Sequence, residues 1–155
     1  MAAHLRSQIF DAVKALLVAI PEFSGAGKVA RGRTAPMRTE ALPAITLTWA
    51  DNDERATARP FAAVEGDLGY DRDLPLSIIV HLRDSDPEPE FDRIATLVEV
   101  VMASAVTLGD LVIEALLVSS RFYVDPQTGL SLGAGRLVYT VSYKSLATDP
   151  SIPAI

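Results

Sequence analysis

Cysteine is absent from the 155 residues, and histidine occurs only twice. The lack of thiols excludes disulfides, thiolate metal sites and cysteine nucleophiles. The two histidines, His4 and His81, lie far apart in the sequence, and neither has a partner at the spacing of metal ligands. We therefore expect no metal site and no cofactor, with His4 near a helix start and His81 on the polar face of a strand.

Long uninterrupted hydrophobic runs are also missing. The N-terminal stretch MAAHLRSQIFDAVKALLVAIPEF is broken by Gln8, Asp11 and Lys14, so it forms no signal-peptide core. The run VKALLVAI is too short to cross a bilayer. The sequence therefore predicts a soluble protein that is not exported and does not bind a membrane.

Positive charge is in deficit, with 14 Lys and Arg against 20 Asp and Glu, for a net charge of −6. A protein that grips duplex DNA through phosphate contacts usually has the opposite balance. Hydrophobic residues make up 49% of the chain, which is enough for one domain with a substantial core.

The stretch SGAGKVARGR, residues 24–33, looks at first like a phosphate-binding loop. A P-loop needs GxxxxGK followed by Ser or Thr, between a strand and a helix. Here Gly27 and Lys28 are followed by Val29, Glu22 stands where the first glycine belongs, and the stretch follows a predicted helix. The nucleotide-binding interpretation fails on both sequence and context.

Other enzyme signatures are equally weak. No GxSxG motif occurs. Carboxylates are frequent between residues 51 and 90, and a paired acid–base site among them is conceivable, but solvated loop and helix-start charge explains them more simply. We predict no catalytic residues, and a small hydrolase or ligand-binding α+β domain stays open as an alternative.

Apolar spacing predicts two main helices. Apolar residues recur at helical spacing from about residue 3 to 20, where Pro21 ends the pattern. A second helix begins after Asp86, a capping residue followed by Pro87. Its expected buried stripe comprises Phe91, Ile94, Ala95, Val98, Val101, Met102 and Ala105.

Alternating residues predict strands at 44–50, 74–83, 112–124 and 131–144. Residues 21–43 read as a long loop with one short strand, and residues 51–73 as a charged loop. The DPQTG stretch is typical of a tight turn, and Gly133 and Gly135 suggest a bulge or bend.

Helices and strands are therefore segregated, which predicts an α+β fold: a largely antiparallel β-sheet flanked by two main helices, with a long C-terminal β-hairpin. We expect one domain over residues 1–146. Residues 147–155, with two prolines, are expected to be an extended, loosely held C-terminal segment.

Charged loops are the candidate contact sites. The excess of cations in residues 21–40 is either an exposed flexible loop or an electrostatic contact, made with acidic loops such as 51–54 of a neighbouring copy or with a passing polyanion. We favour contact with acidic loops of a neighbouring copy. The candidate interface or lumen residues are Lys28, Arg31, Arg33, Arg38, Asp51, Asp53 and Glu54.

The order of segments resembles a known family. These are LRSQIFDAVKALLVAIP, LPAITLTWADNDE, FDRIATLVEVVMASAVTLGDLV and the closing IEALLVSSRFYVDPQTGLSLGAGRLVYTVSYKS. Together they resemble the tail-terminator proteins of long-tailed phages, the family that contains the lambda-type minor tail protein U. The resemblance covers nearly the whole chain, but residues 55–70 match nothing in it.

The resemblance implies a structural role without catalysis. It implies a hexameric ring at the head-proximal, neck end of the tail, assembled in the host cytoplasm, that stops tube polymerisation. The implied partners are the tail tube protein, a neck or head-completion protein, and double-stranded DNA that passes through the lumen without specific binding. A head–tail connector or tail-completion protein is the alternative within the same class.

Overall fold

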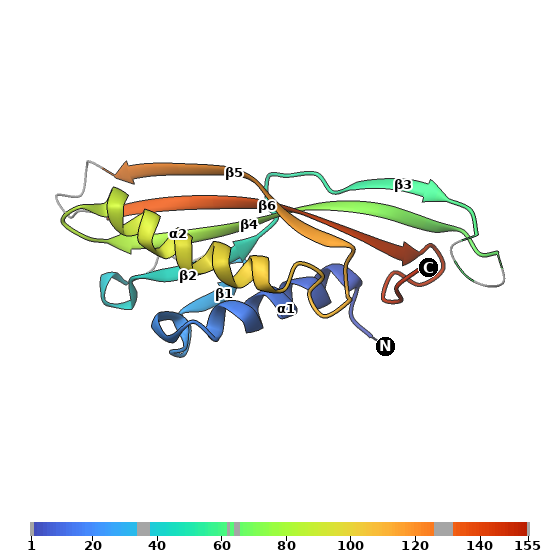
Figure 1. The fold of residues 1–155 in the computed structure, drawn as a ribbon, viewed down its shortest axis with the longest axis horizontal. Helices are drawn as coiled ribbons and strands as arrows, with labels where there is room; N and C mark the ends of the chain where they lie inside the picture. Colours follow the sequence, from blue (N-terminus) through green and yellow to red (C-terminus); the bar gives the residue numbers. More distant parts are fainter. Residues whose placement is uncertain (1, 34–37, 62, 64–65, 126–131, 155) are drawn as a thin grey trace.

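The computed structural model describes residues 2–33, 38–61, 63, 66–125 and 132–154, and it confirms the α+β class (Figure 1). The helices are α1 (Leu5–Val18) and α2 (Pro87–Ser104), with short 3-10 turns at Pro21–Phe23 and Thr39–Ala41. The strands are β1 (Val29–Arg31), β2 (Ala44–Thr48), β3 (Arg55–Arg59), β4 (Gly69–Arg83), β5 (Glu114–Asp125) and β6 (Leu132–Leu146).

All six strands belong to one sheet with the order β1-β2-β4-β6-β5, and β3 pairs with β4 off this path. Among the described strand pairs, only β1 and β2 are parallel. The long strands β4 and β6 pair over their full lengths, from Gly69 opposite Leu146 to Arg83 opposite Leu132. The predicted C-terminal hairpin is formed by β5 and β6. The sheet is therefore built around the β4–β6 ladder and has β5 at one edge.

The segment 51–73 contains strands, so the prediction of a charged loop there is wrong. Arg55 pairs opposite Asp73 and Thr48 pairs opposite Ser77, both on the same side of β4. Strands β2 and β3 thus follow one line along β4, interrupted by residues 49–54. The side chains of β3 are almost all exposed. The sequence of this strand therefore lacks the row of large apolar residues that predicts a half-buried strand.

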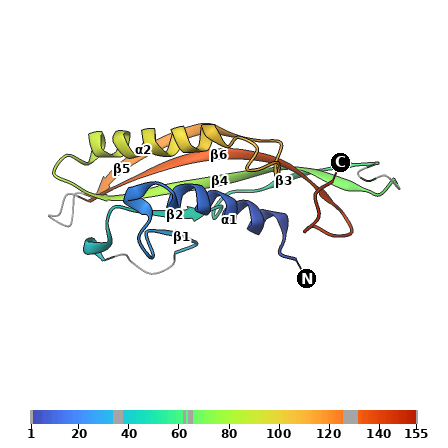
Figure 2. The same ribbon diagram turned by 60° about the horizontal axis from the view of Figure 1, so that its bottom comes forward.

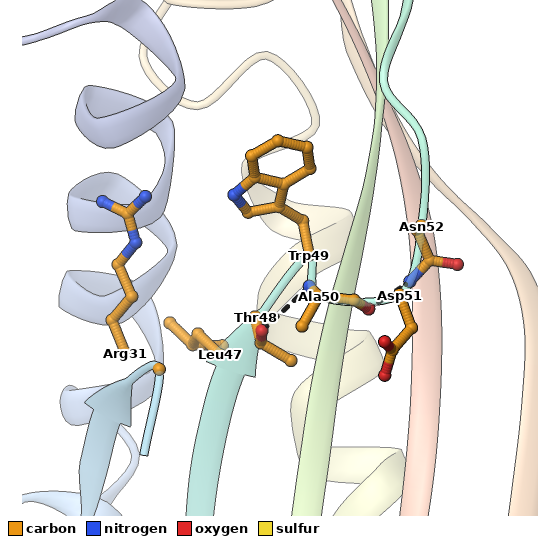
Figure 3. A pocket seen from close by; sticks show the side chains of 8 residues that line it. Arg31, Leu47, Thr48, Trp49, Ala50, Asp51 and Asn52 are labelled. Atoms are coloured by element: carbon orange, nitrogen blue, oxygen red, sulfur yellow. Dashed lines mark hydrogen bonds between the residues drawn. The ribbon is translucent and has the colours of Figure 1, made fainter. Parts of the chain in front are cut away.

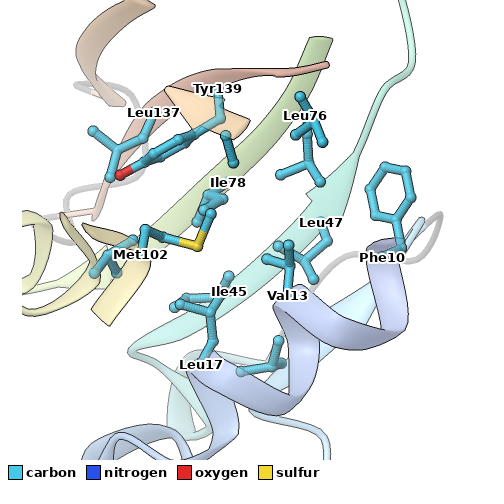
Figure 4. Close-up of a cluster of buried hydrophobic side chains, with 14 of the residues drawn as sticks. Phe10, Val13, Leu17, Ile45, Leu47, Leu76, Ile78, Met102, Leu137 and Tyr139 are labelled. Atoms are coloured by element: carbon cyan, nitrogen blue, oxygen red, sulfur yellow. The ribbon is translucent and has the colours of Figure 1, made fainter. Parts of the chain in front are cut away.

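Both helices lie on the same side of the sheet (Figures 1 and 2). The inward residues of α1 and α2 meet Leu74, Leu76, Ile78, Val80 and Leu82 of β4, which are all buried. Figure 4 shows Val13 and Leu17 of α1 facing Ile45 and Leu47, with Met102 of α2 over the centre of the sheet. The expected alternation of β4 is confirmed. The opposite face of the sheet has no helix over it among the described residues.

Helix α2 begins where the sequence indicated, with Asp86 at the N-cap and Pro87 first, but the Asp86 side chain makes no capping hydrogen bond. Instead, the Asp84 carboxylate accepts the Asp86 backbone N–H at 2.9 Å. Val98 is fully buried, whereas Val101 and Ala105 are only partly buried. The predicted stripe thus includes two residues, Val101 and Ala105, that the fold leaves partly exposed.

The glycines of β6 make room for helix α2 and do not form a bulge. A Cβ atom at Gly135 would lie 1.8 Å from the Phe91 ring, and one at Gly133 would lie 3.1 Å from Pro87 and Phe122. The irregularity is in the partner strand, between Leu117 and Ser119 of β5. All but the first residue of the DPQTG turn lies outside the described residues.

The C-terminal segment folds back on the domain, although we expected it to be loosely held. Pro150 accepts a backbone hydrogen bond from Leu5 at 3.0 Å, and Pro153 forms a bridge with Ser145. Gln8 of α1 donates to the Ser151 carbonyl at 3.1 Å. Residues 147–154 therefore tie the end of β6 to the start of α1.

Candidate assembly surfaces

The basic loop of residues 24–33 is largely bound within its own subunit. Lys28 Nζ donates to the carbonyls of Ala41 and Pro43 at 2.9 and 3.2 Å. The Arg31 guanidinium lies 4.4 Å from the centre of the Phe10 ring and donates to Ser7 Oγ at 3.0 Å. These cations hold the loop against α1 and the start of β2.

Arg33 is the most constrained of the predicted contact residues. Its guanidinium donates to Thr46 Oγ1 at 3.1 Å and to the Gly27 carbonyl at 2.6 Å. Further bonds reach the carbonyls of Lys28 and Ile45. His81 Nε2 lies 2.9 Å from the same Thr46 hydroxyl. Burial and the nearby Arg33 charge lower the pKa of His81.

Of the predicted cations, only Arg38 is exposed without a hydrogen bond or ion pair of its side chain among the described residues.

The acidic residues of the 51–54 loop separate into two groups. Asp51 and Asp53 are exposed, and Asp51 has a positive φ of 64°. Glu54 points inward, with a side chain only 5% exposed. Asp51 and Asp53 therefore remain surface candidates, while the Glu54 carboxylate is used inside the subunit.

Glu54 is the centre of a buried polar cluster. Its Oε1 accepts from Arg6 Nη1 and from Arg72 Nη1, each at 2.9 Å. Its Oε2 accepts the Tyr143 hydroxyl at 2.6 Å. Burial raises the pKa of Tyr143, and the hydrogen bond to Glu54 adds to this shift. The cluster joins α1, the 49–54 loop, β4 and β6, which sequence spacing alone could not bring together.

A hollow of about 350 Å³ opens beside the basic loop (Figure 3). It is lined by Arg31, Gly32, Leu47, Thr48, Trp49, Ala50, Asp51 and Asn52. Figure 3 shows Arg31 on one side and Trp49 on the other, with Thr48 bonded to the Ala50 N–H at 3.0 Å. Arg31 and Asp51 thus lie around the same hollow in one subunit. The basic loop and the acidic loop are neighbours on one side of the molecule.

No group of three or more His, Asp or Glu side chains among the described residues is placed to hold a metal ion. Within the same part of the chain, no helix has the length and apolar character needed to span a membrane.

Strand β5 is the surface that the sequence analysis missed. Among the described strands it pairs only with β6, so no other described strand lies along its outer edge. At its start, the Ala115 N–H is taken by the Val106 carbonyl at 2.9 Å. Beyond that point Leu116, Val118 and Val124 are 47%, 59% and 54% exposed, and Tyr123 is also exposed. A long edge strand with apolar side chains favours association with another chain.

Comparisons with known proteins give little guidance. No protein-family model matches the chain, and no curated protein matches it. It is similar to a chain of the solved structure described as "Virion of native gene transfer agent (GTA) particle", with a TM-score of 0.44 and 11% identity over 92% of each chain. A likeness at this TM-score and identity does not bear on function.

Proposed function

We propose that this chain is a structural virion protein of a phage-like particle and acts as a tail terminator. In this role it caps the head-proximal end of the tail tube, stops tube polymerisation and forms the surface that meets the neck or head-completion protein. Support comes from the resemblance of its segments, in order and over nearly the whole chain, to the tail-terminator family. The α+β fold with a long β5–β6 hairpin has the architecture that this resemblance implies.

The observation that carries the proposal is the exposed apolar edge of β5, beside a sheet face that no helix of the described residues covers. In the part of the chain that the structure describes, helices cover one face only, and β5 exposes several large apolar side chains. A free-standing subunit with such an edge is prone to stick to other chains. A protein that works inside a permanent assembly covers this surface with its neighbours.

A closed ring requires contact between two different patches of each subunit. Arg31 and Asp51 line one hollow, so the basic loop of one copy and the acidic loop of the next do not by themselves provide two opposed patches. Arg38, Asp51 and Asp53 remain candidates for contact with a stacked neighbour, such as the tube or the neck. The sheet face and the β5 edge then form the lateral contact between copies.

The charge of the chain suits the passage of DNA through a ring. Each subunit carries a net charge of −6. A hexamer of such subunits repels the phosphate backbone overall, which discourages DNA from adhering to the lumen.

Deleting the gene from the virus that encodes it tests the role. Loss of a terminator leaves tube growth unchecked, so we expect headless tails that are longer than normal by electron microscopy. Complementation with the intact chain should restore the normal length. Tails of normal length that fail to join heads would overturn the terminator role and support the head–tail connector instead.

A further inference from the structure

We infer that the open face of the sheet at β5 and β6 binds the acidic segment Asp84–Glu90 of a second copy of this chain. This inference names the lateral contact of the proposed ring, and it rests on the proposed function only in requiring that copies associate. The basic patch is defined here as Arg121 of β5 and Arg136 of β6, together with Leu116 and Tyr123, which share their face.

The strand register places the two arginines side by side on the face away from the helices. Arg121 pairs directly opposite Arg136. The next residue of β6, Leu137, is buried in the core together with Tyr139. Because successive side chains of a strand point to opposite faces, Arg136 points away from the core. Like charges directly opposite each other on a sheet are destabilising. The positive charges of Arg121 and Arg136 therefore repel each other in the folded chain, and a bound anion would reduce this repulsion.

No carboxylate on the neighbouring rows of this face neutralises the pair. The three central rows run Ser119–Val138–Ser77–Thr48, Arg121–Arg136–Ile79–Thr46 and Tyr123–Ala134–His81–Ala44. Among the described residues neither arginine makes an ion pair, and the Arg136 Nε is buried without a hydrogen-bond partner. Arginine and tyrosine beside apolar side chains are the composition of protein interfaces.

The acidic segment is the complementary surface. Asp84, Asp86, Glu88 and Glu90 stand within seven residues. Glu90 pairs with Arg93 and Asp84 accepts the Asp86 N–H, whereas the Asp86 and Glu88 side chains are exposed and make no such bond among the described residues. Pro87 and Pro89 fix the backbone between these residues, which lowers the entropy cost of binding.

The two surfaces lie on opposite faces of the sheet. Pro87 and Phe91 at the start of α2 pack against Gly133 and Gly135 on the helix-covered side, while Arg121 and Arg136 point to the open side. Contact between the acidic segment of one copy and the basic patch of the next is therefore heterologous, the type that generates rings. Because each subunit has a net charge of −6, it repels duplex DNA overall, so the acidic segment of a second copy is the more favourable partner for the basic patch.

Two charge-reversal variants test the contact in solution. The first carries Arg121→Glu and Arg136→Glu, and the second carries Asp86→Arg and Glu88→Arg. At low salt we expect wild-type protein to associate in analytical ultracentrifugation, and each variant alone to associate at least about tenfold more weakly. A mixture of the two should recover association, because each basic surface then meets an acidic one in an alternating assembly.

Matched controls are Lys14→Glu and Asp11→Arg, which reverse exposed charges on α1 and should leave association unchanged. Thermal unfolding shows whether each variant folds. If Arg136→Glu prevents folding, Arg121→Glu alone is mixed with the acidic-segment variant, since Arg121 is exposed.

A wild-type chain that stays monomeric, or a mixture that does not recover association, would overturn the contact. Binding of duplex DNA that is lost with Arg121→Glu would replace the second copy with DNA as the occupant. Neither result bears on tail length in the gene deletion, so the terminator role is judged separately.

Discussion

At the scale of single residues, the charged groups of this chain divide between internal structure and surface. Glu54 looks like one more loop carboxylate in the sequence, yet it binds two arginines and a tyrosine in the folded chain. Arg33 likewise uses its guanidinium on the backbone around it. A local sequence pattern cannot distinguish these residues from Asp53 or Arg38, because their partners come from distant segments.

Removing the Glu54 carboxylate should destabilise the fold. Glu54→Ala leaves the charges of Arg6 and Arg72 and the buried Tyr143 hydroxyl without their acceptor, so we expect a loss of about 3 kcal/mol in the free energy of unfolding. Urea unfolding measures the change. The neighbouring exposed Asp53→Ala serves as the control and should shift stability by no more than about 0.5 kcal/mol. Equal effects of the two substitutions would contradict the buried cluster.

His81 should make the folded chain sensitive to mild acid. Its pKa is lowered in the folded state from the ordinary value of 6.5, first by burial and then by the Arg33 charge. The folded state then binds this proton less readily than the unfolded chain, so its contribution to stability is present above pH 6.5 and is lost as pH falls below it.

Unfolding at pH 7.5 and pH 5.5 checks this expectation. His81→Gln, which keeps a hydrogen-bonding side chain beside Thr46, should lose less stability than the wild type between the two pH values. The same loss in both proteins would show that His81 is not perturbed.

At the scale of elements, the sequence predicted best the strands and helices that have one buried face and one solvent-exposed face. Leu76, Ile78, Val80 and Leu82 alternate clearly, and the start of α2 is marked by Asp86 and Pro87. Strand β3 was missed because its RATAR segment is exposed on both faces and depends on pairing with β4. The basic patch was missed because its two arginines meet only through the β5–β6 register.

The packing of α2 on β6 depends on the absence of a side chain at Gly135. Gly135→Ala places a Cβ atom where the Phe91 ring lies, so the ring has to move, at an expected cost of about 1–3 kcal/mol. Gly25→Ala is the control, since its nearest contact, Lys28 Cγ at 3.4 Å, is an ordinary one. Differential scanning calorimetry compares the two, and an unchanged melting temperature for Gly135→Ala would contradict the close contact.

The helix register is tested by charges at two neighbouring positions of α2. Val98→Asp buries an unpaired carboxylate in the core and should unfold the domain, while Val101→Asp should be milder because Val101 is only partly buried. Circular dichroism against temperature measures both. A more severe effect at Val101 than at Val98 would contradict the burial of Val98 in the core and the partial exposure of Val101.

At the scale of the whole molecule, the fold is asymmetric in a way that suits assembly. One face of the sheet is covered by helices, and the other carries the basic patch beside an exposed apolar edge. The acidic segment lies on the covered side, so each copy can present one surface to the copy before it and a different one to the copy after it. The resemblance to tail terminators and this asymmetry are independent grounds for the same proposal.

Electron microscopy of intact tails, with this chain labelled at its N-terminus, shows whether the protein caps the tail tube. We expect the label only at the head-proximal end of each tail, on a closed sixfold ring that follows the last tube layer. A label distributed along the tube, or absent from purified tails, would contradict this expectation.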